Sequence, residues 1–199
     1  MATCWEHGAR VQLSYCGNPR RKLAWTLERV DMGAGWVGVH TGRTNSVMAE
    51  GIAAGSVPSL GGYRELRREV TYAPRAQERG RLDIGLFNGP GPDALVEVKN
   101  VTLLDHDRLR FPDAVSERAR KHLGLLRAAV SEGRRGVIIF AVNRPEGECF
   151  APAWSIDPAY GERLSEVLKG GVEAFVVRIQ HGEQNMEVGE RLPLVVDGD

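Results

Sequence analysis

The sequence contains little cysteine, little lysine and no long apolar run. Its three cysteines, Cys4, Cys16 and Cys149, are widely spaced and form no CxxC pair, which argues against a disulfide framework or a zinc site. The longest apolar stretch, GVIIFAV at 136–142, is far too short to span a bilayer, and the start MATCWEHGAR lacks an apolar core of signal-peptide length. We therefore expect a cytoplasmic protein without a membrane partner.

Net charge is also absent, because 26 Lys and Arg residues balance 26 Asp and Glu residues. A chain with zero formal charge has no overall electrostatic attraction to nucleic acid or to a membrane. The charge is spread unevenly, however, since residues 1–75 hold ten basic residues against six acidic ones. The N-terminal part is thus the better candidate for contact with a polyanion.

The hydrophobic pattern predicts a small all-β meander followed by a mixed α/β region. Short strands are expected at 9–15, 23–30 and 35–40, and a weak helix capped by Thr44 or Asn45 follows. The later expected elements are a strand at 67–72, a hairpin at 81–100, a helix at 111–133, a strand at 136–142, a helix at 157–171 and a strand at 172–179. This order implies a mixed sheet with helices on its faces. The acidic tail has little to pack against and is expected to be loose.

The hairpin at 81–100 carries charged residues inside strands that alternate apolar and polar positions. Asp83 lies on the first strand, and Glu97 and Lys99 share one face of the second. Two carboxylates and the backbone carbonyl of Val98 are hard oxygen ligands of the kind that a divalent metal such as Mg²⁺ prefers. A nearby ammonium can orient an attacking water or offset charge on a phosphoryl group. This site requires Asp83 to pair with Glu97 or Lys99; the alternative is a solvated face with a cross-strand ion pair.

Two groups of basic side chains are candidates for phosphate contact. Arg118, Lys121 and His122 are spaced i, i+3 and i+4, so they share one face of the helix after the hairpin. The alternative is an ordinary basic helix surface. A tight turn of the β-meander holds the second group, which consists of Arg20, Arg21 and Lys22. Such a turn suits contact with a phosphate backbone, and a merely solvated turn is the alternative.

Further patterns carry less weight. Glu50 on the first expected helix and Glu69 on the strand at 67–72 are candidate additional acids at the metal site, with a solvated glutamate as the alternative for each. Asp105-His106-Asp107 superficially resembles a metal cluster but is interpreted as a polar loop. GAGWVG at 33–38 fits G-x-G-x-x-G, yet a strand rather than a helix follows it, so we interpret it as a turn.

Several stretches together resemble one protein family. They are NPRRKLAWTLERV, WVGVHTGRTN, GYRELRREVTY, EVKNVTL and FPDAV, and they extend from near the start to about Val177. On these residues the chain is similar to the sugar fermentation stimulation protein A (SfsA) family. The resemblance implies a small N-terminal domain like an OB fold, the barrel type often used for nucleic acids, and a PD-(D/E)xK nuclease-like domain similar to restriction endonucleases.

The resemblance also implies roles for individual residues. In the PD-(D/E)xK class the acid of the second strand and the E-x-K of the third bind metal and assist hydrolysis, and these roles fall on Asp83, Glu97 and Lys99. Glu50 is a weaker match to an acid on the first helix. The family is regarded as DNA-binding, and its name reflects an effect on sugar (maltose) metabolism. The metal expected at the site is Mg²⁺ or Mn²⁺.

The expected fold class is therefore α/β, with a restriction-endonuclease-like domain after a small OB-like β domain. We expect an N-terminally incomplete OB-like domain at 1–45, because family members begin with additional strands, a nuclease-like domain at 46–180 and an acidic flexible tail at 181–199. The expected function is DNA binding with metal-dependent phosphodiester hydrolysis. The alternative is a non-cleaving DNA-binding regulator of sugar (maltose) metabolism genes. Activity on sugars themselves is disfavoured, because a lysine beside the acids does not serve a glycosidase.

Overall fold

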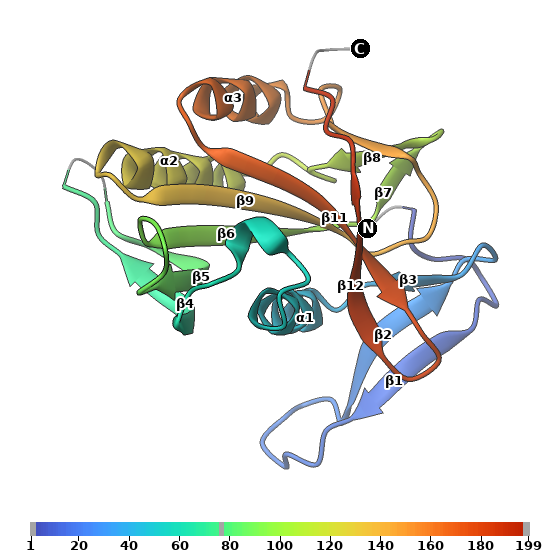
Figure 1. Cartoon of the computed structure of the whole chain (residues 1–199). Coiled ribbons are helices and arrows are strands. Elements are labelled where there is room, and N and C mark those ends of the chain that lie inside the picture. The colour runs from blue at the N-terminus through green and yellow to red at the C-terminus, as the bar shows by residue number, and fades with distance from the viewer. Residues whose placement is uncertain (1–2, 76–77, 197–199) are drawn as a thin grey trace.

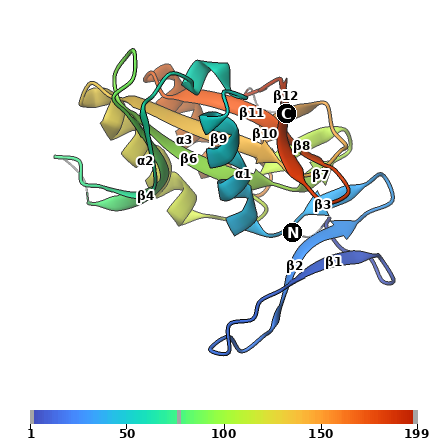
Figure 2. The ribbon, with the colours of Figure 1, turned by 60° about the horizontal axis from the view of Figure 1, so that its bottom comes forward.

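The structure, a computed structural model, describes residues 3–75 and 78–196 and begins with a three-stranded antiparallel sheet (Figure 1). The strands of this N-terminal sheet are β1 (Val11–Tyr15), β2 (Trp25–Asp31) and β3 (Trp36–Gly38). They lie where the sequence predicts them. The turn between β1 and β2 extends away from the rest of the molecule (Figure 2).

The body of the molecule is a six-stranded mixed sheet with the order β12-β11-β9-β6-β5-β4. β4, β5 and β6 are antiparallel neighbours, β6, β9 and β11 run parallel, and β12 is antiparallel to β11. The strands are β4 (Glu65–Tyr72), β5 (Gly80–Phe87), β6 (Ala94–Val101), β9 (Arg135–Val142), β11 (Glu173–His181) and β12 (Met186–Leu192). The predicted mixed sheet is confirmed.

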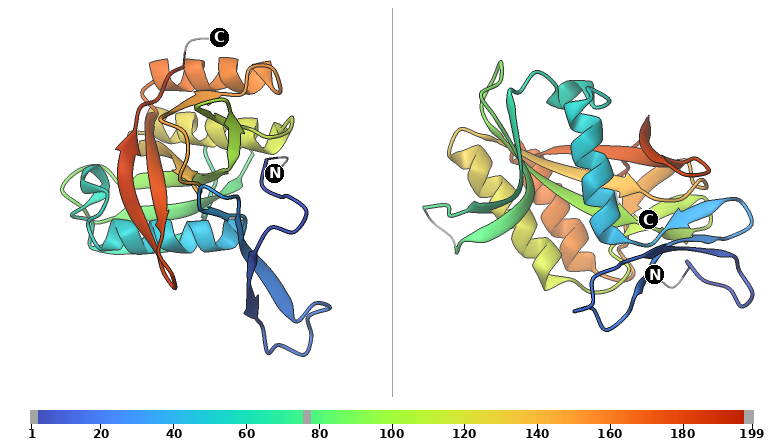
Figure 3. Two further views of the ribbon diagram at one scale, coloured as in Figure 1. Left: turned by 90° about the vertical axis from the view of Figure 1, so that its right-hand side faces the viewer. Right: turned by 90° about the horizontal axis from the view of Figure 1, so that it is seen from below.

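Helices cover both faces of this sheet. α1 packs on one face and α2 and α3 pack on the other (Figure 3). Their bounds are α1 (Thr41–Ala53), α2 (Glu117–Ser131) and α3 (Pro158–Lys169), and a short 3-10 turn spans Pro58–Leu60. Each helix layer buries its own apolar core, because the α1 side includes Met48 and Ile52 while the other side includes Leu123 and Leu164. No helix in the described part of the chain has the length and apolar character needed to cross a membrane.

A small second sheet was not expected from the sequence. Its strands fall between β6 and β11 in the order of the chain. It has the order β10-β8-β7 and consists of β7 (Leu103–Asp105), β8 (Arg108–Phe111) and β10 (Cys149–Pro152). His106 and Asp107 form the turn between β7 and β8. The expected helix at 111–133 therefore starts late: Phe111 ends a strand, and the α2 N-cap is Ser116, whose Oγ accepts a hydrogen bond from the Ala119 N–H at 3.2 Å.

The expectation of a loose tail at 181–199 is wrong for residues 186–192. Residues 186–192 form β12, which pairs with β11 and covers what would otherwise be an open sheet edge. Met186 and Val188 of this strand pack against the core under α1, so this part of the tail has apolar contacts that hold it in place. Residues 197–199 lie outside the described residues.

Candidate functional site

Neighbouring strands β5 and β6 bring the predicted catalytic residues together. Their register pairs Ile84 with Val96, and one further step places Asp83 opposite Glu97. The ladder ends there, and Asp83 Oδ2 accepts a hydrogen bond from the backbone N–H of Val98 at 2.8 Å. The register that the metal hypothesis required is therefore present.

These residues line an open cavity of about 490 Å³. Its walls come from the start of α1, from β5 and β6, and from the start of α2. Asp83, Glu97, Val98, Lys99 and Arg118 all line it. The N–H and C=O of one strand residue point to the same strand edge, so the Val98 carbonyl faces the side on which the ladder with β5 has ended.

Glu97 is almost completely buried, with 2 % of its surface exposed. Its Oε1 accepts hydrogen bonds from Lys99 Nζ at 2.6 Å and from His122 Nδ1. Burial by itself would raise the pKa of this carboxyl, but the His122 hydrogen bond and the charge of Lys99 outweigh it and lower the pKa. Glu97 is thus held as a carboxylate. Its Oε2 is buried and has no hydrogen-bond partner among the described residues.

Asp83 lies in a less favourable environment for a charge. Its Oδ1 accepts a hydrogen bond from Asn45 Nδ2 of α1 at 2.7 Å. Burial, followed by the negative charge of Glu97, raises the pKa of Asp83 to about 6, although the Val98 N–H and Lys99 act in the opposite direction. A raised carboxyl pKa in a cavity is typical of functional sites.

The oxygen atoms present fit a hard divalent cation. Glu97 Oε2 is a buried acceptor without a donor, and Asp83 and the Val98 carbonyl add two further oxygens on the same cavity wall. Within residues 3–75 and 78–196 no group of three or more His, Cys, Asp or Glu side chains is placed to hold a metal. The arrangement therefore resembles sites in which one or two carboxylates bind Mg²⁺ and water and substrate phosphate complete the shell.

The predicted basic face of α2 is divided by the structure. Arg118 lines the cavity, as expected for a phosphate contact. His122 is buried, with 7 % of its surface exposed, and bonds Glu97, so it is not available to a DNA backbone. Lys121 Nζ instead pairs with Glu78 at 2.9 Å outside the cavity. The three side chains project from the same side of α2, but β6 covers the part of that side where His122 lies.

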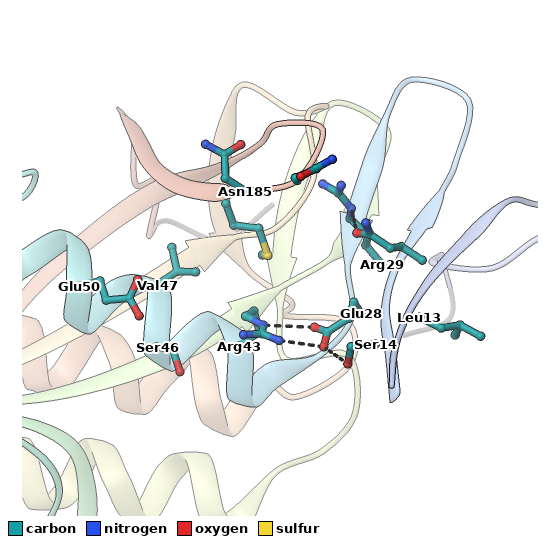
Figure 4. A pocket seen from close by; sticks show the side chains of 12 residues that line it. Leu13, Ser14, Glu28, Arg29, Arg43, Ser46, Val47, Glu50 and Asn185 are labelled. Atoms are coloured by element: carbon teal, nitrogen blue, oxygen red, sulfur yellow. Dashed lines mark hydrogen bonds and ion pairs between the residues drawn. The ribbon is translucent and has the colours of Figure 1, made fainter. Parts of the chain in front are cut away.

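The structure does not bring Glu50 to the site. Glu50 lines a different cavity, between α1, the N-terminal sheet and the β11–β12 turn (Figure 4). There Glu28 accepts hydrogen bonds from Ser14 and Arg43, and these outweigh its burial and lower its pKa to about 2. Helix α1 contributes Asn45 to the Asp83 site instead, because a residue five positions farther along points to another side of the helix.

The other two predicted groups also lie apart from the cavity. Glu69 falls between the paired positions Arg68–Ile84 and Val70–Leu82 and so opposite Asp83, but its carboxylate is half-exposed and pairs with Arg81 at 2.7 Å. The second group is the exposed turn between β1 and β2, which consists of Arg20, Arg21 and Lys22. Neither group lines the cavity.

Polar residues that we did not predict surround the site. The sequence suggests Asn45 only as a helix cap, but α1 begins at Thr41 and so places Asn45 inside the helix, facing Asp83. Thr44 Oγ1 and Asn143 Nδ2 both donate to Asn100 Oδ1, at 3.0 and 2.5 Å, and these bonds join α1, β6 and the end of β9. The polar run GRTN at 42–45 contains Thr44 and Asn45, but the partners of these two residues lie far away in the sequence.

Comparison with known proteins agrees with this architecture. Residues 42–185 match the family model described as the sugar fermentation stimulation protein RE domain, and residues 1–39 match the SfsA N-terminal OB domain. The chain belongs to the SfsA family. The predicted fold class, a restriction-endonuclease-like α/β domain after an OB-like β domain, is confirmed. The exact boundary at 45/46 stays a prediction.

Relatives match along most of the chain. A sugar fermentation stimulation protein homolog from Acidithiobacillus ferrooxidans is 45 % identical over 195 residues, which are 96 % of this chain and 82 % of that SfsA protein. A homolog of the same name from Geobacter sulfurreducens is 43 % identical over 195 residues, or 98 % of this chain and 82 % of the relative. The solved structure of Pyrococcus furiosus SfsA in complex with Ca²⁺ has a TM-score of 0.82, 24 % identity, and coverage of 93 % of this chain and 77 % of its own. At that identity it supports the fold alone.

Proposed function

We propose that this SfsA protein binds DNA and hydrolyses phosphodiester bonds with the help of Mg²⁺ or Mn²⁺. The observation that carries the proposal is the orphaned Oε2 of Glu97, a buried carboxylate oxygen beside Asp83 in an open cavity. A buried carboxylate oxygen without a hydrogen-bond partner is costly, and a divalent cation satisfies it. Pyrococcus furiosus SfsA, a protein of the same fold, was solved in complex with Ca²⁺, which is a cation of this class.

The side chains around the cavity supply the remaining chemistry. Asp83, Glu97 and the Val98 carbonyl would hold the cation, which supplies Lewis-acid stabilisation of charge on the phosphoryl group. Lys99 Nζ, 2.6 Å from Glu97 Oε1, carries an ammonium that can donate a hydrogen bond to the attacking water or to a phosphoryl oxygen. Arg118 at the cavity wall can bind the phosphate of the scissile strand.

Basic residues beyond the cavity support a polyanionic substrate. Six exposed arginines lie on the edge strand β4, just before it, in the loop after it and at the start of β5; they are Arg64, Arg67, Arg68, Arg75, Arg79 and Arg81. Two of them pair with glutamates, Arg67 with Glu65 and Arg81 with Glu69. Exposed arginines near a phosphodiester site contribute salt-dependent, sequence-independent contacts to a nucleic-acid backbone.

Metal-dependent cleavage is the direct test. Supercoiled plasmid and labelled single-stranded DNA are incubated with the protein and Mg²⁺, Mn²⁺ or EDTA, beside Asp83→Ala, Lys99→Ala and, as a control outside the cavity, Lys121→Met. We expect cleavage that requires metal, is lost at least 100-fold in the first two variants and persists in Lys121→Met. Residual cutting of equal rate in all proteins would indicate a contaminating nuclease and contradict the proposal.

A non-cleaving regulator of sugar (maltose) metabolism genes is the second candidate. The names of the relatives favour a role in sugar metabolism, and the ion pair of Lys99 with Glu97 leaves the lysine only 12 % exposed. A regulator would need the arginines but not Asp83. DNA that is bound but never cut, with equal affinity for wild type and Asp83→Ala, would select this function.

A further inference from the structure

The two oxygens of Glu97 have opposite surroundings. Oε1 accepts two donors, Lys99 Nζ from the same strand and His122 Nδ1 from α2. Oε2 accepts none among the described residues, although it is equally shielded from water. A carboxylate with both donors on one oxygen has its orientation fixed, so that the free oxygen points in one direction.

His122 reaches Glu97 through the packing of α2 on the sheet. Its neighbour Leu123 lies in the core beneath the helix, and His122 itself is 7 % exposed. Because a carboxylate oxygen can only accept, Nδ1 must carry the hydrogen in this contact. Such a bond from a packed helix holds a carboxylate more rigidly than a bond from a long, flexible side chain.

We propose that His122 is the positioning residue of the metal site: its Nδ1–H fixes Glu97 Oε1, so that Oε2 binds the divalent cation through a single oxygen. This inference rests on the function proposed above and assigns the role of one residue in it. Hydrogen-bond partners of metal-binding carboxylates commonly set metal affinity in this way.

The two donors on Oε1 have different tasks. Lys99 has further N–H donors for the attacking water or the phosphoryl group, so its ammonium is shared between Glu97 and the substrate during hydrolysis. His122 is too deeply buried to leave Glu97 for substrate, so its hydrogen bond to Oε1 remains while Lys99 acts. The site therefore keeps its cation during the step in which its lysine is used.

Binding of Mn²⁺ to the intact chain, measured by electron paramagnetic resonance without DNA, tests this role. In His122→Asn the amide nitrogen can occupy the place of Nδ1 and donate to Oε1, whereas His122→Leu removes the donor. We expect about 10- to 100-fold weaker Mn²⁺ binding for His122→Leu, the range seen for such partners, and at most about 3-fold weaker binding for His122→Asn. Lys121→Met removes a neighbouring charge of α2 and should bind like wild type.

The outcomes separate the inference from the proposed function. No Mn²⁺ binding by the wild type would overturn the metal site itself. Two results would overturn the positioning role alone. In one, the wild type and His122→Leu bind Mn²⁺ with equal affinity. In the other, His122→Asn binds Mn²⁺ as weakly as His122→Leu. Thermal melting in EDTA shows whether each variant folds. If His122→Leu does not fold, His122→Gln, whose amide sits one carbon farther out, replaces it and should be as weak.

Discussion

Asp83 keeps a carboxylate where its surroundings oppose the charge. Burial and the nearby Glu97 raise its pKa from 3.8 to about 6. At neutral pH Asp83 is therefore ionised in the folded protein, which stabilises this negative charge less than water would. Such a cost is common where a residue serves a site rather than the fold. Asp83 should therefore lower stability when no cation is bound.

The first prediction is that Asp83→Asn stabilises the metal-free protein at pH 8. The folded-state pKa is higher than the unfolded one, so the cost of ionisation is fully present above about pH 6 and disappears as the pH falls toward 3.8. We expect a gain of about 1–3 kcal/mol at pH 8 in EDTA, from roughly 1.4 kcal/mol per pKa unit, and almost none at pH 4. Urea unfolding at both pH values measures it. An equal gain at the two pH values would show that the carboxylate charge is not the cause.

The central site residues could be predicted from the sequence, but their surroundings could not. Alternation along the second strand of the hairpin places Glu97 and Lys99 on one face, and the register seen in the structure adds Asp83 to that face. Whether His122 points to solvent or to Glu97 depends on how α2 is rotated against the sheet. Asn45 meets Asp83 across 38 residues of chain, and no local pattern records such a contact.

Helix α1 and strand β12 approach each other closely at Gly51. A Cβ atom added to Gly51 would lie 2.2 Å from Val188 Cγ2 and 3.0 Å from Val188 Cβ. Val188 is β-branched and packed in the core under α1, so it has little freedom to move aside. Glycine at this helix position is therefore needed for the packing of the last strand.

The second prediction concerns this contact. Gly51→Ala should destabilise the protein by about 1–3 kcal/mol, the usual cost of overpacking, even though alanine favours a helix over glycine by about 1 kcal/mol. Val188→Ala removes Cγ2, the methyl group that the new Cβ would meet at 2.2 Å. Combined with it, Gly51→Ala should become neutral or stabilising. A double-mutant cycle by urea unfolding measures the coupling, and simple additivity of the two changes would contradict the close contact.

Long, strongly patterned elements could be predicted from the sequence, whereas the strands of the small second sheet and β12 could not. The apolar run of β9 and the capping residues of α3 are clear in the sequence. In α3, Asp157 accepts a hydrogen bond from the Tyr160 N–H at 3.0 Å, as its position before Pro158 predicts. β7, β8 and β10 contain three or four residues each, too few for an alternation pattern. β12 is hidden because its pattern is interrupted near Gly189, where the pairing with β11 shifts register.

On the scale of the whole molecule, the N-terminal sheet is fastened to the body by buried polar contacts. Arg29, 2 % exposed, donates to the carbonyls of Gly182 and Glu183 in the β11–β12 turn, and its guanidinium lies 4.7 Å from the Trp36 ring centre. Gly38 N donates to the carbonyl of Asn143 at 2.8 Å. Because the chain passes from β3 directly into α1, these contacts also set where the start of α1 meets the cavity.

The last prediction is that Arg29→Leu loosens the N-terminal sheet without unfolding the body. Leucine cannot donate to the two carbonyls of the β11–β12 turn, and buried acceptors that lose their donor cost about 1–3 kcal/mol. Amide hydrogen exchange of β1–β3 should accelerate about 5- to 150-fold, while β6 and β9 in the centre of the six-stranded sheet keep their protection. Arg20→Leu, at an exposed arginine in the turn between β1 and β2, is the matched control and should change neither region. Equal acceleration in β1–β3 and β9 would mean that the sheet and the body open as one cooperative unit, and that Arg29 stabilises the whole fold rather than this attachment.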